Sequence, residues 1–178
     1  RRAAGNGIEL MGVIAFRASP VWVLAALADV AGFGRQLIPE IAESLDLVAL
    51  LERQAGRLDA AEQLHREALA IKLAALGEDD PAVAETHNLL GIARRWRGDF
   101  AGAETEYRVA LGIWRRAYGE DHPKVAMALN NLALVLHVRG DHAGARRIFE
   151  ELLPLRRRLL GPEHPDYQVT LANYAKLL

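Results

Sequence analysis

This 178-residue chain contains an internal repeat with a period of 42 residues. One column of prolines and two columns of glycines recur at this spacing. A fixed period of this length is typical of a solenoid, in which each unit stacks on its neighbours and together they bury a continuous core. The three columns are Pro81, Pro123 and Pro165; Gly56, Gly98 and Gly140; and Gly77, Gly119 and Gly161.

Each unit has the start and end signals of a helix, a turn and a second helix. Proline is favoured at the first position of a helix, because its missing N–H would have no partner there. A glycine followed by arginine or aspartate then ends the first helix, and the second helix begins. We therefore predict an all-α chain, with repeats at residues 39–80, 81–122 and 123–164 and a partial fourth repeat at residues 165–178.

Small and large apolar residues recur at helical spacing, which predicts the faces that pack. Small residues allow close approach of the paired helices, and they are Ala49, Gly91 and Ala133 on first helices and Ala61, Ala103 and Ala145 on second helices. Large residues are expected to fill the remaining space, and they are Val48, Leu90, Leu132 and Tyr174 on first helices and His65, Tyr107, Phe149, Leu76, Tyr118 and Leu160 on second helices.

Two segments resemble a known repeat. HPKVAMALNNLALVLHVRGDHAGARRIFEELLPLRRRLLGPEHP, residues 122–165, and GIWRRAYGEDHP, residues 112–123, are similar to the 42-residue tetratricopeptide repeat of kinesin light chains and of many bacterial repeat proteins. The resemblance covers residues 40–178 and is weakest in the first unit, which has Leu47 and Glu52 at atypical positions. It implies a right-handed α-solenoid whose first helices line a concave groove for an extended peptide or a partner helix.

The groove would be formed by first-helix residues that do not pack, which share one face when they are spaced i, i+4 and i+7. An asparagine amide can pair with both a carbonyl and an N–H of a peptide backbone, and an arginine can hold a carboxylate through two hydrogen bonds. Tryptophan is enriched among binding hot spots. We therefore expect an extended protein ligand with acidic groups and a large apolar side chain. The candidate groove residues are Asp46, Arg53, Asn88, Ile92, Arg95, Trp96, Asn130, Asn131, Leu134, His137 and Asn173.

Structural roles remain open for several of these residues. Asn88 and Asn130 are able to bridge neighbouring helices within the scaffold. The alternative role of Arg53 and Arg95 is that of ordinary solvated arginines, because surface charges are common on any helix. Trp96 stands close to a predicted helix end, so its alternative role is to cover the neighbouring turn and not to bind a ligand.

Composition and motifs argue against most other functions. The chain has no cysteine. Its net charge of -1 and pI near 6.7 give no overall positive charge that would attract nucleic acid or an anionic membrane. No metalloprotease, phosphate-loop or nucleophile-elbow motif is present, and His122 and His164 recur at one phase of the repeat, which indicates a structural role. We expect no enzymatic activity, no cofactor and no metal site. We also expect a cytoplasmic protein, and the arginine- and alanine-rich composition favours a bacterial source.

Residues 1–38 lie outside the repeats. Ser19 and Pro20 begin an apolar run, residues 21–30, which favours a short helix. We expect this segment to cap the first repeat or to end a preceding domain, and the chain to be a piece of a longer protein. The alternative function is a sensor, regulatory or oligomerisation arm of a larger bacterial signalling NTPase, with self-association through the repeat ends.

Overall fold

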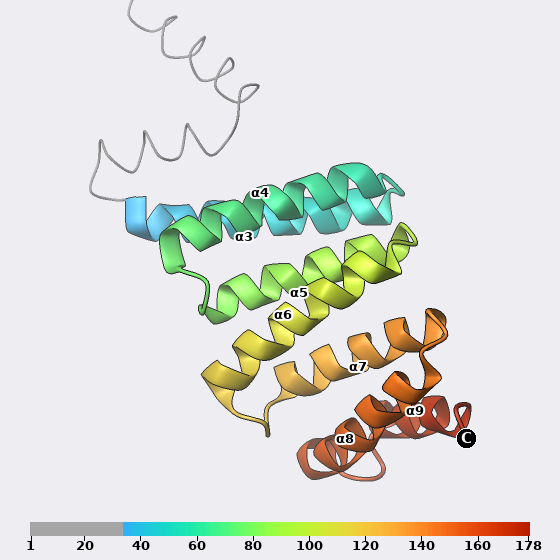
Figure 1. Cartoon of the computed structure of the whole chain (residues 1–178). Helices are drawn as coiled ribbons and strands as arrows, with labels where there is room; N and C mark the ends of the chain where they lie inside the picture. The colour runs from blue at the N-terminus through green and yellow to red at the C-terminus, as the bar shows by residue number, and fades with distance from the viewer. Residues whose placement is uncertain (1–33) are drawn as a thin grey trace, which may run out of the picture. The chain divides into compact units, whose positions relative to one another are not determined.

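The computed structural model describes residues 34–178, with side chains from residue 39 onward. Within that range the predicted all-α architecture is confirmed (Figure 1). Within the described residues, the contacts divide the chain into two compact units, residues 34–77 and residues 78–178. Residues 1–33, including the helix predicted at residues 21–30, lie outside the described residues. The helices are α3 (Gly34–Gln54), α4 (Leu58–Leu76), α5 (Pro81–Trp96), α6 (Phe100–Tyr118), α7 (Pro123–Val138), α8 (His142–Leu160) and α9 (Pro165–Ala175).

Helices α5, α7 and α9 each begin at a proline of the 42-residue column, as predicted. The residue before the proline caps each helix. The Asp80 carboxylate accepts the N–H of Ala82 at 2.7 Å, and Nδ1 of His122 and of His164 accepts the backbone N–H two residues on, at 3.2 and 3.1 Å. A side-chain acceptor at this position satisfies a donor that the first turn leaves unpaired. The structural role predicted for the two histidines is therefore confirmed.

Helix α3 departs from this pattern, because it begins at Gly34 and contains Pro39 in its interior. Position 39 belongs to the proline column, so a helix start was expected there. The preceding residue is an isoleucine, which carries no acceptor to cap a first turn. With no capped start at this point, the helix extends further toward the N-terminus and begins at Gly34.

The turns within repeats are built alike. Gly56, Gly98 and Gly140 have φ values of 77°, 84° and 83°, in the left-handed region that glycine adopts without strain. The residue after each glycine donates its N–H to the carbonyl oxygen five residues earlier, at 2.9, 3.0 and 2.9 Å. This is the Schellman arrangement, which pairs carbonyls that the helix end would otherwise leave open. The predicted ends of α3, α5 and α7 are thus set by local backbone chemistry.

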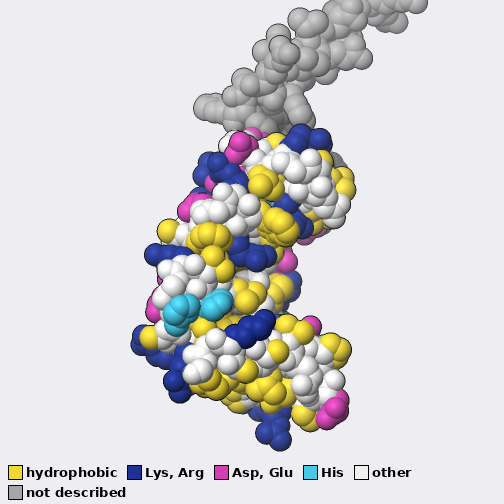
Figure 2. Space-filling view, turned by 90° about the vertical axis from the view of Figure 1, so that its right-hand side faces the viewer, with side chains coloured by type: hydrophobic (Ala, Val, Ile, Leu, Met, Phe, Trp, Pro, Cys, Tyr) yellow, Lys and Arg dark blue, Asp and Glu magenta, His cyan; other side chains and the backbone are white. Residues whose placement is uncertain are grey.

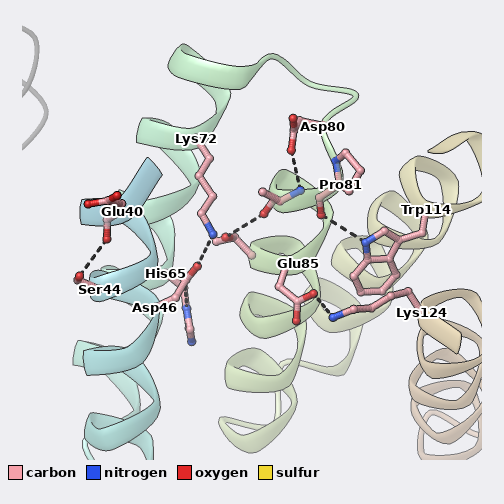
Figure 3. A network of polar contacts seen from close by, with 12 residues as sticks. Glu40, Ser44, Asp46, His65, Lys72, Asp80, Pro81, Glu85, Trp114 and Lys124 are labelled. Atoms are coloured by element: carbon pink, nitrogen blue, oxygen red, sulfur yellow. Dashed lines mark hydrogen bonds and ion pairs between the residues drawn. The ribbon is translucent and has the colours of Figure 1, made fainter. Parts of the chain in front are cut away.

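The core of the second unit lies between α5, α6, α7 and α8, and α9 packs on α8. Leu90, Leu132, Tyr107 and Phe149 are at most 1% exposed, so these predicted packing positions are confirmed. Trp114 is also buried, and its Nε1 donates to the carbonyl oxygen of Pro81 at 3.3 Å (Figure 3). Each large apolar side chain buried in this way contributes roughly 1.5–3 kcal/mol to the free energy of unfolding.

In the first unit, α3 packs on α4 through a small cluster centred on Ala42, Ala68 and Ile71. The predicted close approach at Ala49 and Ala61 is confirmed, because both are fully buried. Small side chains at these positions let the two helix backbones pack closely.

Three predicted packing residues are instead exposed. Val48 is 44% exposed, Tyr118 is 44% exposed and Leu160 is 39% exposed. Tyr118 and Leu160 are the last residues of α6 and α8, where the chain turns into a connector and part of the side chain stays in water. The Tyr118 ring stacks on the His122 ring, with centroids 4.1 Å apart. The assignment of these three residues to the core is wrong.

Candidate functional site

Asp46 and Arg53 are the two candidate residues of the first unit, and both lie on α3. Asp46 is 5% exposed. Its carboxylate lies 2.6 Å from Nδ1 of His65 and accepts from Nζ of Lys72 at 2.9 Å (Figure 3). A buried carboxylate requires such partners, because removing it from water is costly. Asp46 is therefore a packing residue of its repeat, and its expected place on an open face is wrong. Arg53 is half-buried.

The asparagines of the second unit divide into one buried residue and three half-buried ones. Asn88 is 2% exposed, and its Oδ1 accepts from Nδ2 of Asn131 at 2.9 Å. This hydrogen bond joins α5 to α7, so Asn88 bridges two helices of the scaffold. Asn130, Asn131 and Asn173 are half-buried, which leaves part of each side chain at the surface.

Arg95 and Trp96 end α5 and form a compact pair. The Trp96 side chain is 58% exposed, and the Arg95 guanidinium carbon lies 6.0 Å from the centroid of its ring. At this distance the cation is attracted to the ring, by about 0.5–1 kcal/mol at an exposed site. The pair presents an apolar surface beside a positive charge.

Tyr107 of α6 supports Arg95 from the core side. Its ring is fully buried and packs on Gly91 of α5, where a Cβ atom would lie 2.6 Å from the tyrosine Cε1. Burial raises the pKa of Tyr107 to about 12, and the charge of Arg95 opposes this rise. The Tyr107 hydroxyl and Nε of Arg95 are both buried without a hydrogen-bond partner among the described residues. The Tyr107 hydroxyl thus lies close to the Arg95 guanidinium, where α6 packs on α5.

Unlike Arg94 beside it, Arg95 forms no ion pair with a carboxylate among residues 39–178. On the same helix, Arg94 lies 2.9 Å from Glu106, which also contacts His87 at 2.6 Å. Other basic side chains that form ion pairs with acids are Arg57, Arg66, Lys72, Arg108, Arg115, Arg116, Lys124, Arg139, Arg146 and Arg158. The half-buried Arg95 is therefore a cation for which the described scaffold supplies no anion.

The remaining candidates extend this face along the first helices. Ile92 on α5 and Leu134 on α7 are half-buried, and His137 near the end of α7 is half-buried beside His142. Figure 2 shows hydrophobic, basic and histidine side chains close together on the side of the molecule in view. We name Ile92, Arg95, Trp96, Asn131 and Leu134 the α5–α7 face.

Sequence reasoning missed the residues that support this face from beneath. Tyr107 was expected to pack, but its link to Arg95 depends on the contact between α5 and α6. A signal was present in the repeat itself, because Gly91 stands where the other units have alanine. Tyr107 likewise stands where the other units have His65 and Phe149. Departures from a repeat column at neighbouring positions indicate a local change in packing.

Comparisons with known proteins agree with this fold. One tetratricopeptide repeat model matches residues 125–166, and a second matches residues 40–111 and 84–137. The crystal structure of BtubC (BKLC) from P. vanneervenii is similar, with 29% identity and a TM-score of 0.73 over 78% of this chain and 56% of that chain. No curated protein matches the sequence significantly.

A second similar structure is that of a Podosopora anserina protein with nearly identical TPR-like repeats, assigned to the kinesin light chains. It has 20% identity and a TM-score of 0.72, and the match covers 78% of this chain and 66% of that chain. The chain therefore spans about half to two thirds of the length of these structures. The matched repeats extend over more than half of the sequence, and the chain belongs to the tetratricopeptide repeat family.

Proposed function

We propose that the chain is a protein-interaction scaffold and that the α5–α7 face binds an extended segment carrying a carboxylate and a large apolar side chain. Tetratricopeptide repeats generally mediate protein–protein interaction. The observation that carries the finer proposal is the half-buried Arg95, which has no carboxylate partner among the described residues. A carboxylate from a ligand would supply that partner in a charge-assisted hydrogen bond, which is stronger than a neutral one.

The apolar part of the ligand would contact Trp96. A tryptophan that is 58% exposed leaves a large apolar surface in water, and covering such a surface is favourable. Arg95 lies against the same ring, so one ligand segment reaches both groups. Half-buried Ile92 and Leu134 offer further apolar contact, and the half-buried amide of Asn131 offers a polar group for a peptide backbone.

The test is a selection of random peptides on the chain, followed by affinity measurements with an enriched peptide. We expect enriched peptides to combine an acidic residue with a large apolar one, and Arg95→Ala to weaken binding about tenfold or more. Arg116→Ala is the matched control, because it removes the same charge from an exposed arginine of α6 that pairs with Asp79. Equal loss in both variants, or loss in neither, contradicts the proposal.

The location and chemistry of the protein form part of this proposal. None of the helices from α3 to α9 is long and apolar enough to cross a membrane. We place the chain in the cytoplasm because it has no cysteine and so needs no oxidising compartment to fold. The proposed role requires neither catalysis nor a cofactor.

A stripe on α3 favours self-association as a second candidate function. Leu47 and Leu51 are 63% and 62% exposed, and Val48 between them is 44% exposed. The residues one period after Val48 and Leu51 are Leu90 and Ala93, and both are buried. Light scattering over a range of protein concentrations tests this candidate: an assembly that Leu51→Glu dissociates supports it, and a monomer at every concentration contradicts it.

A further inference from the structure

We infer that His137 and His142 form a binding site for a divalent transition-metal ion at the turn between α7 and α8. The Nδ1 atoms of the two rings lie at hydrogen-bond distance from each other, 3.3 Å, and the ring centroids lie 5.2 Å apart. Zinc binds imidazole nitrogen at about 2.0–2.1 Å in a tetrahedral arrangement, which places two ligand atoms about 3.3 Å from each other. The observed separation therefore suits one ion held by both rings.

The turn holds the two rings in this arrangement. His137 is in the last turn of α7 and His142 is the first residue of α8. Between them, Gly140 donates its N–H to the carbonyl of His137 at 3.0 Å, and Asp141 caps α8 by accepting the N–H of Gly144 at 2.8 Å. Because the backbone on both sides is hydrogen-bonded, the two imidazoles are brought together before any ion binds, and this lowers the cost of binding.

The repeat shows that neither histidine is required by the scaffold. Position 137 corresponds to Arg53 and Arg95 in the other units, and position 142 corresponds to Leu58 and Phe100. Leu58 and Phe100 are half-buried, whereas His142 is exposed. A polar ring thus replaces an apolar side chain at this position, beside a second histidine that also departs from its column. Two coincident departures toward the same residue type favour a shared ligand.

The other four histidines of the chain have Nδ1 engaged within the scaffold. Nδ1 of His65 contacts Asp46 and that of His87 contacts Glu106, both at 2.6 Å. Nδ1 of His122 and of His164 caps a helix. The exposed histidine patch in Figure 2 lies on the side that faces the viewer, which is the right-hand side of Figure 1, where α7 turns into α8.

Two imidazoles define the class of ion and the number of open positions. Nitrogen ligands select zinc, nickel or copper over calcium and magnesium, which prefer oxygen. No group of three or more metal-binding side chains is found among the described residues, so the pair supplies two ligands and leaves the others to water or to a bound partner. The ion would bind to the neutral rings through Nδ1, with the remaining proton of each ring on Nε2.

The experiment is a calorimetric titration of the 178-residue chain, free of any histidine affinity tag, with Zn²⁺ and with Ni²⁺. His142→Phe and His137→Arg each install a residue that another repeat carries at the same position, so both are expected to fold. We expect saturable one-to-one binding by the wild type and affinity at least about tenfold weaker in each variant. His122→Asn, which keeps a helix cap, should bind like the wild type.

Three outcomes would overturn the inference: no saturable binding by the wild type, undiminished binding in either of the two pair variants, or loss of binding in His122→Asn. Circular dichroism of each variant confirms that the helices are intact. A variant that loses helicity is replaced by His142→Leu or His137→Gln, and the same criteria apply.

Discussion

Replacing Gly91 with alanine tests the close contact between α5 and the Tyr107 ring of α6. A Cβ atom at position 91 would lie 2.6 Å from Cε1 and 2.8 Å from Cδ1 of Tyr107. Carbon atoms in contact normally lie about 3.5–4.0 Å apart, so the new atom would be about 1 Å too close to the ring. Tyr107 is fully buried, and the close packing of protein interiors leaves a ring there little room to move.

The size of the effect follows from two opposing terms. Alanine is favoured over glycine inside a helix by about 1 kcal/mol, which stabilises the variant. Overpacking a close-packed core costs about 1–3 kcal/mol, and a rigid ring at this distance belongs at the upper end. We therefore expect Gly91→Ala to lower the free energy of unfolding by about 2 kcal/mol.

Gly112 on α6 provides a matched control, because a Cβ atom there would meet only the end of the flexible Arg116 side chain, at 3.5 Å. Gly112→Ala should raise the free energy of unfolding by about 1 kcal/mol, so the two substitutions should differ by about 3 kcal/mol. The assay is urea unfolding followed by far-ultraviolet circular dichroism. If Gly91→Ala is as stable as the wild type, the tight packing of Tyr107 on this helix is refuted.

Two further substitutions test buried polar groups, each in the same unfolding assay. Tyr107→Phe should leave the stability at neutral pH unchanged or raise it by about 1 kcal/mol, because the buried hydroxyl has no described hydrogen-bond partner. Burial raises the pKa of Tyr107 to about 12. An unfolded tyrosine ionises near pH 10, so stability is retained below about pH 10 and lost by about 3 kcal/mol as the pH rises to about 12. The phenylalanine variant should lack that part of the alkaline loss, and an identical pH profile would contradict the assignment. Asp46→Ala should lower the free energy of unfolding by about 3 kcal/mol, because it leaves the buried His65 and Lys72 without their carboxylate. A loss below about 1 kcal/mol would show that Asp46 and its two partners are not buried in solution.

The helices and most of their ends could be predicted from local sequence patterns. Proline at the first position of a helix and glycine with positive φ are requirements of the local backbone, so the 42-residue columns predicted α5 to α9 closely. The exception, α3, occurs where an isoleucine takes the place of the capping residue before Pro39. Burial of the small-residue columns was also predictable, because helix pairs of this length must pack along a regular stripe.

Which polar residues of the first helices are buried depends on contacts between helices and could not be predicted from the repeat. Asp46 and Asn88 share a column with Asn130, but both are buried, because His65, Lys72 and Asn131 on other helices supply their partners. Those partners lie 19, 26 and 43 residues away in the sequence, beyond the reach of any local pattern. Whether a carboxylate or an amide can be buried depends on such distant groups, since its desolvation must be offset by hydrogen bonds that only the packed helices provide.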